Sequence, residues 1–455
     1  MSVPFKKILI ANRGEIALRV ARTCREMGVP CVAVHSTADA GAPFVAFADE
    51  AVCVGPPPSR RSYLYMPSLI EAARRHGADA VHPGYGFLSE DADFARVCAE
   101  NGITFIGPAP EVMERVGDKA RVRGLMAEAG LPVLPGSAGP VTSLAEAERI
   151  AATTTGYPVV VKAAAGGGGR GIAVAGSAAE LRDAYRETVA LARALFGNGD
   201  VYLERYVPGA RHVEVQILCD GHGGAVHLGE RDCSLQRRNQ KLVEEAPAPG
   251  LSDGQRAELG RHAVRGALSV GYTGAGTMEF LLAPDGVATF MEINARIQVE
   301  HPVTEMITGL DLVREQIRIA AGEPLGYTQR DVRLDGAAVE CRINAEDPDA
   351  EFRPTPGRLD RLDLPGGPGI RVDAGFVAGG TVPPYYDSLI AKLVAWGRTR
   401  EQAIARAERA LAETTVAGPG VRTTIPLLRR LLGHPAFADG RHTTRFVNDL
   451  LAGGL

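Results

Sequence analysis

The chain is 455 residues long, which at about 100–200 residues per domain predicts two to four domains. Hydrophobic residues make up 45% and charged residues 23%, a composition typical of globular proteins that excludes a disordered or fibrous chain. The net charge of −4 argues against binding to nucleic acid or an anionic membrane, and no apolar run approaches the roughly 18 residues of a membrane span. The seven scattered cysteines, without a Cys-x-x-Cys pair, predict a reducing cytoplasmic location and no zinc site.

The N-terminal third alternates between strand and helix patterns. Residues 6–11 predict a strand, and the pattern over 16–27 predicts a helix that ends before Gly28. Further strands are expected over 29–35, near 80–81 and near 103–105, and helices over 67–76 and 91–100. This alternation predicts a parallel sheet with helices on its faces. The first turn, 12–15, lacks Gly-x-Gly-x-x-Gly, so it does not support a dinucleotide site.

Two further units follow in the chain. The patterns after residue 117 predict helices over 118–129, 144–152 and 178–195, and strands over 157–163, 172–175 and 201–204. From about 207 the chain is rich in strands, with helices expected near 253–270, 309–321 and 400–413. The predicted domains are therefore 1–117, an α/β unit with a parallel sheet; 118–206, a linker helix with a small unit; and 207–455, a strand-rich C-terminal unit.

A glycine-rich loop follows the strand that ends near Lys162. Glycines let backbone N–H groups approach an anion without interference from Cβ, so the loop can cradle phosphates. Lys162 stands at the strand end, where it could reach the same phosphates. The connection runs from strand to strand and is not a P-loop, and a plain flexible hairpin is the alternative. The glycines concerned are Gly166, Gly167, Gly168 and Gly169.

Lysine is rare in this chain. Only six of the 50 basic residues are lysines, so a lysine can mark a position that needs a compact charge. Lys119, Lys162 and Lys241 are candidates for such positions, and Lys392 is interpreted as a chance retention in a late strand.

The segment 276–294 predicts a hairpin whose turn is Asp285-Gly286, a dipeptide favoured in two-residue turns. In that register Glu279 faces Glu292, and Thr277 faces Asn294 on the same side. Two carboxylates placed directly opposite repel unless a cation lies between them. Carboxylate and amide oxygens favour Mg²⁺ or Mn²⁺. The alternative is a solvated face with two unrelated glutamates.

Polar and apolar residues continue to alternate after Glu292. If the chain stays extended, Asn294, Arg296, Gln298 and Glu300 line one side. This set predicts an oxyanion site beside the metal, with Arg296 and Gln298 holding the anion and Glu300 removing a proton. A solvent-exposed face would give the same pattern.

The motifs together resemble the biotin carboxylase family of ATP-grasp enzymes over essentially the full chain. The matching segments are 10–17, 82–90, the loop after Lys162, 230–234, 292–305 and 339–346. The resemblance implies an N-terminal α/β domain, a mobile ATP-grasp lid and a C-terminal catalytic domain. It also implies ATP-dependent carboxylation of biotin by bicarbonate through carboxyphosphate, with ATP and Mg²⁺ or Mn²⁺ as cofactors.

The resemblance assigns roles to individual residues. It implies that Lys119 and Lys162 contact the ATP phosphates, that Glu204 and the main chain near Val207 hold adenine, and that His212 and Gln236 lie near the ribose and base. Glu279 and Glu292 would hold Mg²⁺ with Asn294 nearby. Bicarbonate would be held by Lys241, Arg296, Gln298 and the Val299 N–H. Glu300 would be the base, and Arg342 would stabilise the biotin enolate.

The sequence departs from the family pattern at three positions close to these residues. Arg205 stands where the family often has Lys, Asn239 where it often has His, and Ala295 where Thr is frequent. Asn239 puts a role for that side chain in doubt. At Arg205 little changes if the contact there is main-chain. At Ala295 we expect little effect, since its side chain points away from the polar row.

The resemblance also implies partners. No Ala-Met-Lys-Met-type biotinylation site occurs, so we expect the biotin to be on a separate biotin carboxyl carrier protein, with a carboxyltransferase subunit as the further partner. Arg22 and Glu26 match family dimer positions and predict a homodimer, although a solvated ion pair is the alternative. Acetyl-CoA carboxylase in fatty acid synthesis is the first expectation. Propionyl-CoA, methylcrotonyl-CoA and pyruvate systems stay open. Another ATP-grasp ligase is the less favoured alternative, because the polar run from Glu292 to Glu300 and Arg342 argue against it. A non-catalytic nucleotide-binding regulator should lack the metal pair or the base, and this chain has both.

Overall fold

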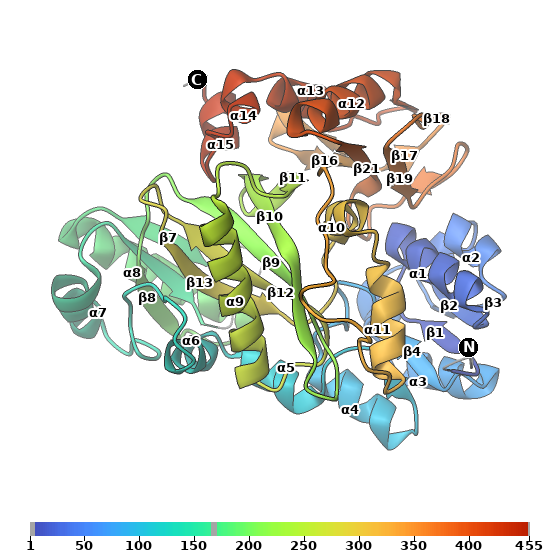
Figure 1. The fold of residues 1–455 in the computed structure, drawn as a ribbon, viewed down its shortest axis with the longest axis horizontal. Helices are drawn as coiled ribbons and strands as arrows, with labels where there is room; N and C mark the ends of the chain where they lie inside the picture. The colour runs from blue at the N-terminus through green and yellow to red at the C-terminus, as the bar shows by residue number, and fades with distance from the viewer. Residues whose placement is uncertain (1–4, 165–170, 454–455) are drawn as a thin grey trace.

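The computed structural model describes residues 5–164 and 171–453. Figure 1 shows a central sheet with the N-terminal unit at its right, a small unit at its left and the C-terminal helices at the top. The N-terminal sheet is parallel with the order β3-β2-β1-β4-β5, as the strand–helix alternation predicts. Its strands are β1 (Ile8–Ile10), β2 (Cys31–Ser36), β3 (Glu50–Gly55), β4 (Ala80–His82) and β5 (Thr104–Phe105). Its helices are α1 (Gly14–Met27), α2 (Pro43–Phe47), α3 (Met66–His76), α4 (Ala92–Glu100) and α5 (Pro110–Gly117).

The sequence prediction missed β3, α2 and α5. β3 is the edge strand, and its short apolar run, 51–54, was not assigned to a strand; its residues alternate between partly buried and exposed until Val54. α2 is a single short helix whose first residue is Pro43, and α5 likewise begins at Pro110. Proline is favoured in the first turn of a helix because its missing N–H is unpaired there in any case.

A small antiparallel sheet, β7-β6-β8, forms the unit at the left of Figure 1. Ser143 and Ser177 cap its two helices by accepting from backbone N–H groups three residues further on. Gly166 to Gly169 lie outside the described residues. The elements of this region are α6 (Lys119–Glu128), α7 (Leu144–Ile150), β6 (Val159–Ala163), β7 (Ile172–Ala175), α8 (Ala178–Phe196) and β8 (Val201–Arg205).

The central element is an eight-stranded antiparallel sheet with the order β13-β12-β9-β10-β11-β14-β21-β19. Its strands are β9 (Arg211–Cys219), β10 (Ala225–Arg237), β11 (Gln240–Ala246), β12 (Gly274–Leu282), β13 (Ala288–Asn294), β14 (Ala337–Asn344), β19 (Ile370–Ala374) and β21 (Leu389–Gly397). Its helices are α9 (Asp253–Ser269), α10 (His301–Thr308), α11 (Leu312–Ala320), α12 (Arg400–Glu413), α13 (Ile425–Leu432), α14 (Pro435–Ala438) and α15 (Phe446–Leu451). Short strands complete the unit: β15 (Glu346–Asp347), β16 (Arg353–Pro354), β17 (Gly357–Arg358), β18 (Arg361–Asp363), β20 (Thr381–Val382) and β22 (Thr415–Ala417).

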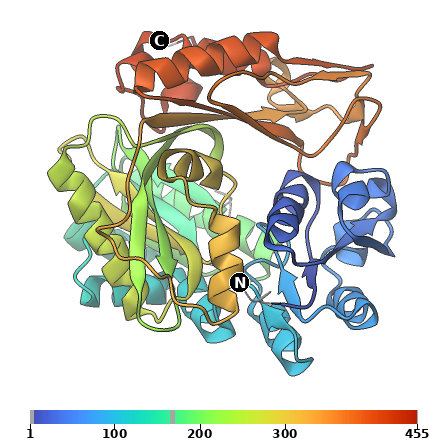
Figure 2. The same ribbon diagram turned by 45° about the vertical axis from the view of Figure 1, so that its right-hand side comes forward.

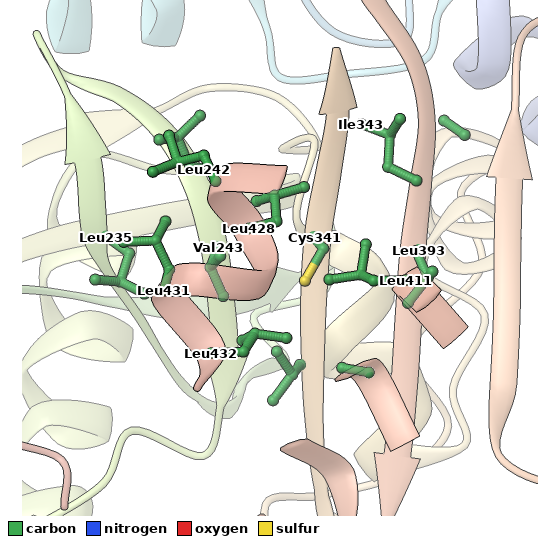
Figure 3. Packing of buried hydrophobic residues seen from close by; sticks show 14 of the residues in the cluster. Leu235, Leu242, Val243, Cys341, Ile343, Leu393, Leu411, Leu428, Leu431 and Leu432 are labelled. Atoms are coloured by element: carbon green, nitrogen blue, oxygen red, sulfur yellow. The ribbon is translucent and has the colours of Figure 1, made fainter. Parts of the chain in front are cut away.

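One face of this sheet packs against the C-terminal helices. Figure 3 shows leucines of α13 packed on β11 and β14, with Leu411 of α12 beside Leu393 of β21. The labelled side chains belong to a buried cluster that also includes Cys341 and Ile343. Because side chains alternate along a strand, the intervening residues point to the other face, toward α10 and the N-terminal unit (Figure 2).

The predicted α/β and α+β architecture is confirmed, and the domain boundaries stay a prediction. Within the predicted 118–206 unit, α6 packs on β13 and α9, because Val122 and Met126 belong to the central core cluster. The predicted strand 6–11 and helix 16–27 both exist with shifted ends, as β1 and α1. Among the described residues, no helix is long and apolar enough to cross a membrane.

The hairpin between β12 and β13 corrects the predicted turn. The backbone bonds from Ala283 N to Val287 O and from Gly286 N to Ala283 O close a three-residue loop, 284–286, instead of the predicted two-residue turn. Gly286 takes a positive φ of 85°, as the last residue of such loops does. A bulge between the Phe280–Phe290 and Glu279–Glu292 pairs then restores the predicted register. Two errors in the prediction therefore cancel at the glutamates.

Candidate functional site

Lys241 on β11 is the centre of a buried group of carboxylates. Its Nζ lies 2.6 Å from Glu214 Oε2, 2.6 Å from Glu300 Oε1 and 3.1 Å from Glu279 Oε1. Burial by itself would lower the pKa of Lys241, but the three carboxylates outweigh burial and raise it well above the usual value. Two clusters of His, Cys and Glu side chains lie here, and the ligand atoms of each cluster are close enough together to hold a metal. The Lys241 ammonium donates to carboxylates of both clusters.

Both carboxylate oxygens of Glu300 are held by cations. Oε1 accepts from Lys241, and Oε2 accepts from Arg342 on β14 at 2.9 Å. Burial would raise the pKa of Glu300, but Lys241, Arg342 and Arg231 lower it far below its ordinary value. Arg342 also donates to Glu244 (2.6 Å), and burial raises the pKa of Glu244 to about 7. Glu300 is therefore ionised and fixed in this arrangement.

Glu279 and Glu292 are direct partners across β12 and β13, as the sequence predicts. Asn294 Nδ2 donates to Glu279 Oε1 (2.9 Å), and Thr277 is paired with Asn294. Lys119 Nζ lies 3.3 Å from Glu292 Oε2. The carboxylate and amide oxygens of this pair match the donors that Mg²⁺ and Mn²⁺ prefer. The donor set fits the predicted metal, and the metal site itself stays a prediction.

The chain after β13 does not stay extended, and this part of the prediction is wrong. The strand ends at Asn294, the segment bends, and a turn at 299–300 leads into α10. α10 begins at His301, where the sequence analysis expected no helix, with Pro302 in its first turn. The polar side chains meet in spite of the bends, since Gln298 Nε2 donates to Glu279 Oε1 (2.9 Å).

Arg296 and the preceding backbone are anchored to the N-terminal unit. Arg296 Nε donates to Glu90 Oε2 (3.0 Å), and the Ala295 N–H donates to Glu90 Oε1 (2.9 Å). Glu90 belongs to the segment 82–90, which the sequence analysis singled out without assigning this contact. The Ala295 side chain is buried in the apolar core, away from the polar groups as predicted.

Arg231 on β10 is a site residue that the sequence analysis left without a role. Its side chain is completely buried, and it donates to Glu214 Oε1 (2.6 Å) and Gln298 Oε1 (2.6 Å). It also donates to Gln216, Thr304 and Thr277. The strict alternation of 212–217, with His, Glu and Gln between Val, Val and Ile, is the signal that could have located this polar strand face.

The predicted nucleotide residues lie on both sides of this group. Lys162 Nζ lies 2.5 Å from Glu204 Oε2, with Lys162 on β6 and Glu204 on β8. His212 Nε2 lies 3.0 Å from Glu279 Oε2, and His212 Nδ1 is 3.3 Å from Gln236 Nε2. Val207 follows the end of β8 by two residues. The structure thus places His212 against Glu279, one of the two predicted metal ligands, as well as beside Gln236.

The departures from the family pattern have structural explanations. Arg205 donates from Nε to Thr155 O (2.7 Å), so its guanidinium holds the backbone before β6. Asn239 lies in the two-residue turn between β10 and β11, where Arg238 and Asn239 have φ values of 49° and 64°. Such a turn requires positive φ at both positions, and Asn tolerates it well.

The predicted dimer residues make contacts within the chain. Arg22 NH1 lies 3.6 Å from Asp373 Oδ1, and Glu26 Oε2 lies 3.7 Å from Arg314 NH2. Both side chains are more than two-fifths exposed. These loose pairs leave both side chains available to a second copy, and the dimer role stays a prediction.

Three family models match consecutive parts of the chain. They are the biotin carboxylase N-terminal domain over residues 4–113, the carbamoyl-phosphate synthase L chain ATP-binding domain over 118–328, and the biotin carboxylase C-terminal domain over 340–449. The chain belongs to the biotin carboxylase family. The resemblance inferred from the motifs is confirmed, and the match to the ATP-binding domain covers the small sheet together with most of the acidic site.

Curated members of the family match this chain over nearly its whole length. A biotin carboxylase of a Nostoc species is 53% identical, with 98% of this chain and 99% of the relative covered. A biotin carboxylase of Haemophilus influenzae is 52% identical, with the same coverage. A chloroplastic biotin carboxylase of Arabidopsis thaliana is 52% identical over 97% of this chain and 82% of the relative.

Solved structures agree in fold. The biotin carboxylase domain dimer of Hydrogenobacter thermophilus 2-oxoglutarate carboxylase, in complex with MgADP, ADP and bicarbonate, has a TM-score of 0.94 and 50% identity, with 98% of this chain and 97% of that chain covered. The biotin carboxylase of Campylobacter jejuni, in a β-γ-ATP complex, has a TM-score of 0.95 and 43% identity, with coverage of 98% and 99%.

Proposed function

We propose that the chain catalyses the ATP-dependent carboxylation of biotin by bicarbonate. The observation that carries the proposal is the fixing of the Glu300 carboxylate between Lys241 and Arg342, beside Arg296 and Gln298. This arrangement provides one acidic group among cationic and amide donors, which an oxyanion substrate with a removable proton requires. The MgADP and bicarbonate bound by the Hydrogenobacter thermophilus domain are the ligands expected for this chemistry.

In the proposed first step, Lys241, Arg296, Gln298 and the Val299 N–H hold bicarbonate. Its negative charge beside Glu300 raises the pKa of that carboxylate, which makes Glu300 a stronger base than in the arrangement described above. Glu300 takes the bicarbonate proton while a bicarbonate oxygen forms a bond to the γ-phosphorus of ATP. The bond from that phosphorus to the bridging oxygen of ADP breaks, and carboxyphosphate and ADP result.

The lysines stabilise the negative charge that develops on the phosphoryl group. Lys119 and Lys162 are the residues of this chain proposed to hold the ATP phosphates, together with the Gly166–Gly169 backbone. Glu279 and Glu292, with Asn294 nearby, would hold Mg²⁺, which when bound screens the charge on the phosphate oxygens. Glu204, the main chain near Val207, His212 and Gln236 are the proposed adenosine contacts.

In the second step, carboxyphosphate gives carbon dioxide and phosphate. The phosphate takes the proton from N1′ of biotin, and N1′ forms the new bond to carbon dioxide. Arg342 offsets the negative charge of the biotin enolate. Glu244, which accepts from Arg342, orients this guanidinium.

The partners and the final carboxyl acceptor belong to the same proposal. A biotin carboxyl carrier protein would present the biotin, a carboxyltransferase subunit would use the product, and two copies of the chain would form a homodimer in the cytoplasm. Acetyl-CoA carboxylase in fatty acid synthesis is the proposed assembly. Carboxylases of 2-oxoglutarate and pyruvate among the structural neighbours keep other acceptors open.

The test is bicarbonate-dependent release of ADP, stimulated by free biotin, in the parent and in Glu300→Gln. General-base catalysis typically contributes about 10²–10⁴-fold, so the variant should lose at least about 10²-fold in this rate while it still binds an ATP analogue. Glu245→Gln is the matched control, because Glu245 is equally buried and bonded to Arg400 on the opposite sheet face. Unchanged turnover of Glu300→Gln would remove Glu300 from the mechanism, and ADP release that ignores bicarbonate would favour another ATP-grasp ligase.

A further inference from the structure

We infer that Lys392 is a positioning residue that fixes the backbone next to Glu300. Lys392 lies on β21, and its side chain is completely buried. Its Nζ donates to the Val299 carbonyl oxygen (2.8 Å) and lies 2.9 Å from Glu15 Oε1. The sequence analysis interpreted this lysine as a chance retention, and these contacts contradict that interpretation. The inference rests on the proposed function, since it concerns the positioning of the proposed base.

The contact controls the backbone of Glu300 through a planar peptide. The Val299 carbonyl belongs to the same peptide unit as the Glu300 N–H and Cα. Holding the carbonyl therefore fixes the plane of this peptide and the position of the Glu300 Cα, from which the side chain departs. Glu300 is the residue before α10, and its carbonyl accepts from the Val303 N–H (3.3 Å), but no side chain caps the helix there.

Lys392 and Arg342 work as a pair on adjacent strands. They are direct partners in the β14–β21 register, so their side chains leave the same face of the sheet. Arg342 holds the carboxylate of Glu300, and Lys392 holds the peptide that precedes it. Two rigid strands thus fix both ends of one side chain, which a positioned base requires.

Glu15 connects this arrangement to the N-terminal unit. Glu15 is at the start of α1, is buried, and also accepts from the Tyr85 hydroxyl. The Lys392 ammonium lies 5.9 Å from the centre of the Tyr85 ring. Tyr85 lies in the segment 82–90, next to the part that contributes Glu90 to Arg296. The chain of contacts from Glu15 through Lys392 to Val299 therefore joins the N-terminal unit to the backbone of the base.

The decisive variant is Lys392→Met, which keeps most of the side-chain length and removes the ammonium. Displacement of a catalytic group by about 1 Å can cost about 10²-fold in rate, so kcat/KM for bicarbonate should fall about 10–10²-fold. The KM for ATP should change less than about twofold. In the part of the chain that the structure describes, none of the residues proposed to hold ATP touches Lys392. A fall in kcat/KM for bicarbonate without a change in the KM for ATP is the result expected when the base is displaced.

Arg400→Met is the matched control. Arg400 is also a largely buried cation that pairs with a glutamate, Glu245, and donates to two backbone carbonyls, at Phe437 and Ala438. Both variants lose stability in thermal unfolding, but only Lys392→Met should alter bicarbonate kinetics. If the two variants show the same kinetic constants as the parent, Lys392 is a structural residue only and the inference is wrong.

Glu15→Gln provides a second measurement should Lys392→Met fail to fold. The amide still accepts from Lys392 but lacks the negative charge, so the same selective loss should appear at smaller size, about 2–5-fold. An unaltered bicarbonate constant in a folded Glu15→Gln protein, with no folded Lys392→Met protein, would overturn the inference. A parent protein that releases ADP without bicarbonate would instead defeat the proposed function, so the two failures are distinguishable.

Discussion

The two faces of the sheet formed by β11, β14 and β21 carry opposite chemistry on the same strands. Val243, Cys341 and Leu393 point toward α12 and α13 and form an apolar cluster (Figure 3). Their chain neighbours Glu244, Arg342 and Lys392 point to the other face, where charged groups surround Glu300. A two-residue repeat thus separates the part of the sheet that stabilises the protein from the part proposed to perform chemistry.

The energetics of the two faces differ accordingly. Full burial of a leucine contributes about 1.5–3 kcal/mol, so the apolar face contributes directly to the free energy of unfolding. Burial of ion pairs is often neutral or costly, because desolvation offsets the attraction between the charges. The charged face therefore adds little net stability, and its residues are better explained by the site that they form. This contrast teaches that burial alone does not identify which residues stabilise this protein.

The largest effect on stability is expected on the apolar face. Leu393→Ala removes a completely buried side chain and should lower the free energy of unfolding by about 2–5 kcal/mol. Urea denaturation measures this change. Leu364→Ala is the control, because Leu364 is 41% exposed and should cost far less. A Leu393→Ala protein that keeps its stability but loses bicarbonate affinity would contradict the separation of the two faces.

The next effect concerns Glu340, which lies opposite Glu244 on the charged face. Neither of its carboxylate oxygens has a hydrogen-bond partner among the described residues, and burial raises its pKa well above the ordinary value although Lys392 opposes this. The folded protein therefore keeps a proton that the unfolded chain releases. The stability from this proton is complete below the unfolded pKa and is lost as pH rises through the folded pKa.

Glu340→Gln should therefore flatten the decline of stability above the ordinary glutamate pKa and gain about 1–3 kcal/mol relative to the parent at pH 8. Urea denaturation at pH 5 and pH 8 tests this, with the exposed Glu128→Gln as control. A parent whose stability rises between these two pH values, with no change on substitution, would show that Glu340 stays ionised. Glu244, with its pKa raised to about 7, adds a decline in the same direction.

The smallest effect is expected for a charged pair outside the sheet. Arg409 and Glu413 lie one turn apart on α12, 2.5 Å from each other, and both side chains are more than two-fifths exposed. Arg409→Ala should cost no more than about 0.5 kcal/mol and less at high salt. Thermal unfolding at two salt concentrations measures it. A cost above about 1 kcal/mol would mean that exposed charges stabilise this fold more than the buried charged face does.

Local patterns predicted much of the molecule. The alternation of strands and helices predicted the N-terminal parallel sheet, and the hairpin pattern predicted that Glu279 faces Glu292. The facing of the two glutamates was predicted from a two-residue turn, but it results from a three-residue loop and a bulge that compensate for each other. The predicted register was therefore correct although the predicted turn was not. The residues of 292–300 were correctly grouped, but bends and the start of α10, rather than an extended strand, bring them together.

The sequence by itself determined which strand positions are polar and which segments form the family motifs, because these depend on residue type and short spacing; the further roles, such as that of Arg342, came from the resemblance those motifs carry. Only the tertiary structure decided that Arg231, Glu90 and Lys392 join the site. Their partners lie 67, 206 and 93 residues away along the chain. Contacts over such separations depend on how sheets and helices pack, and no local pattern records that packing.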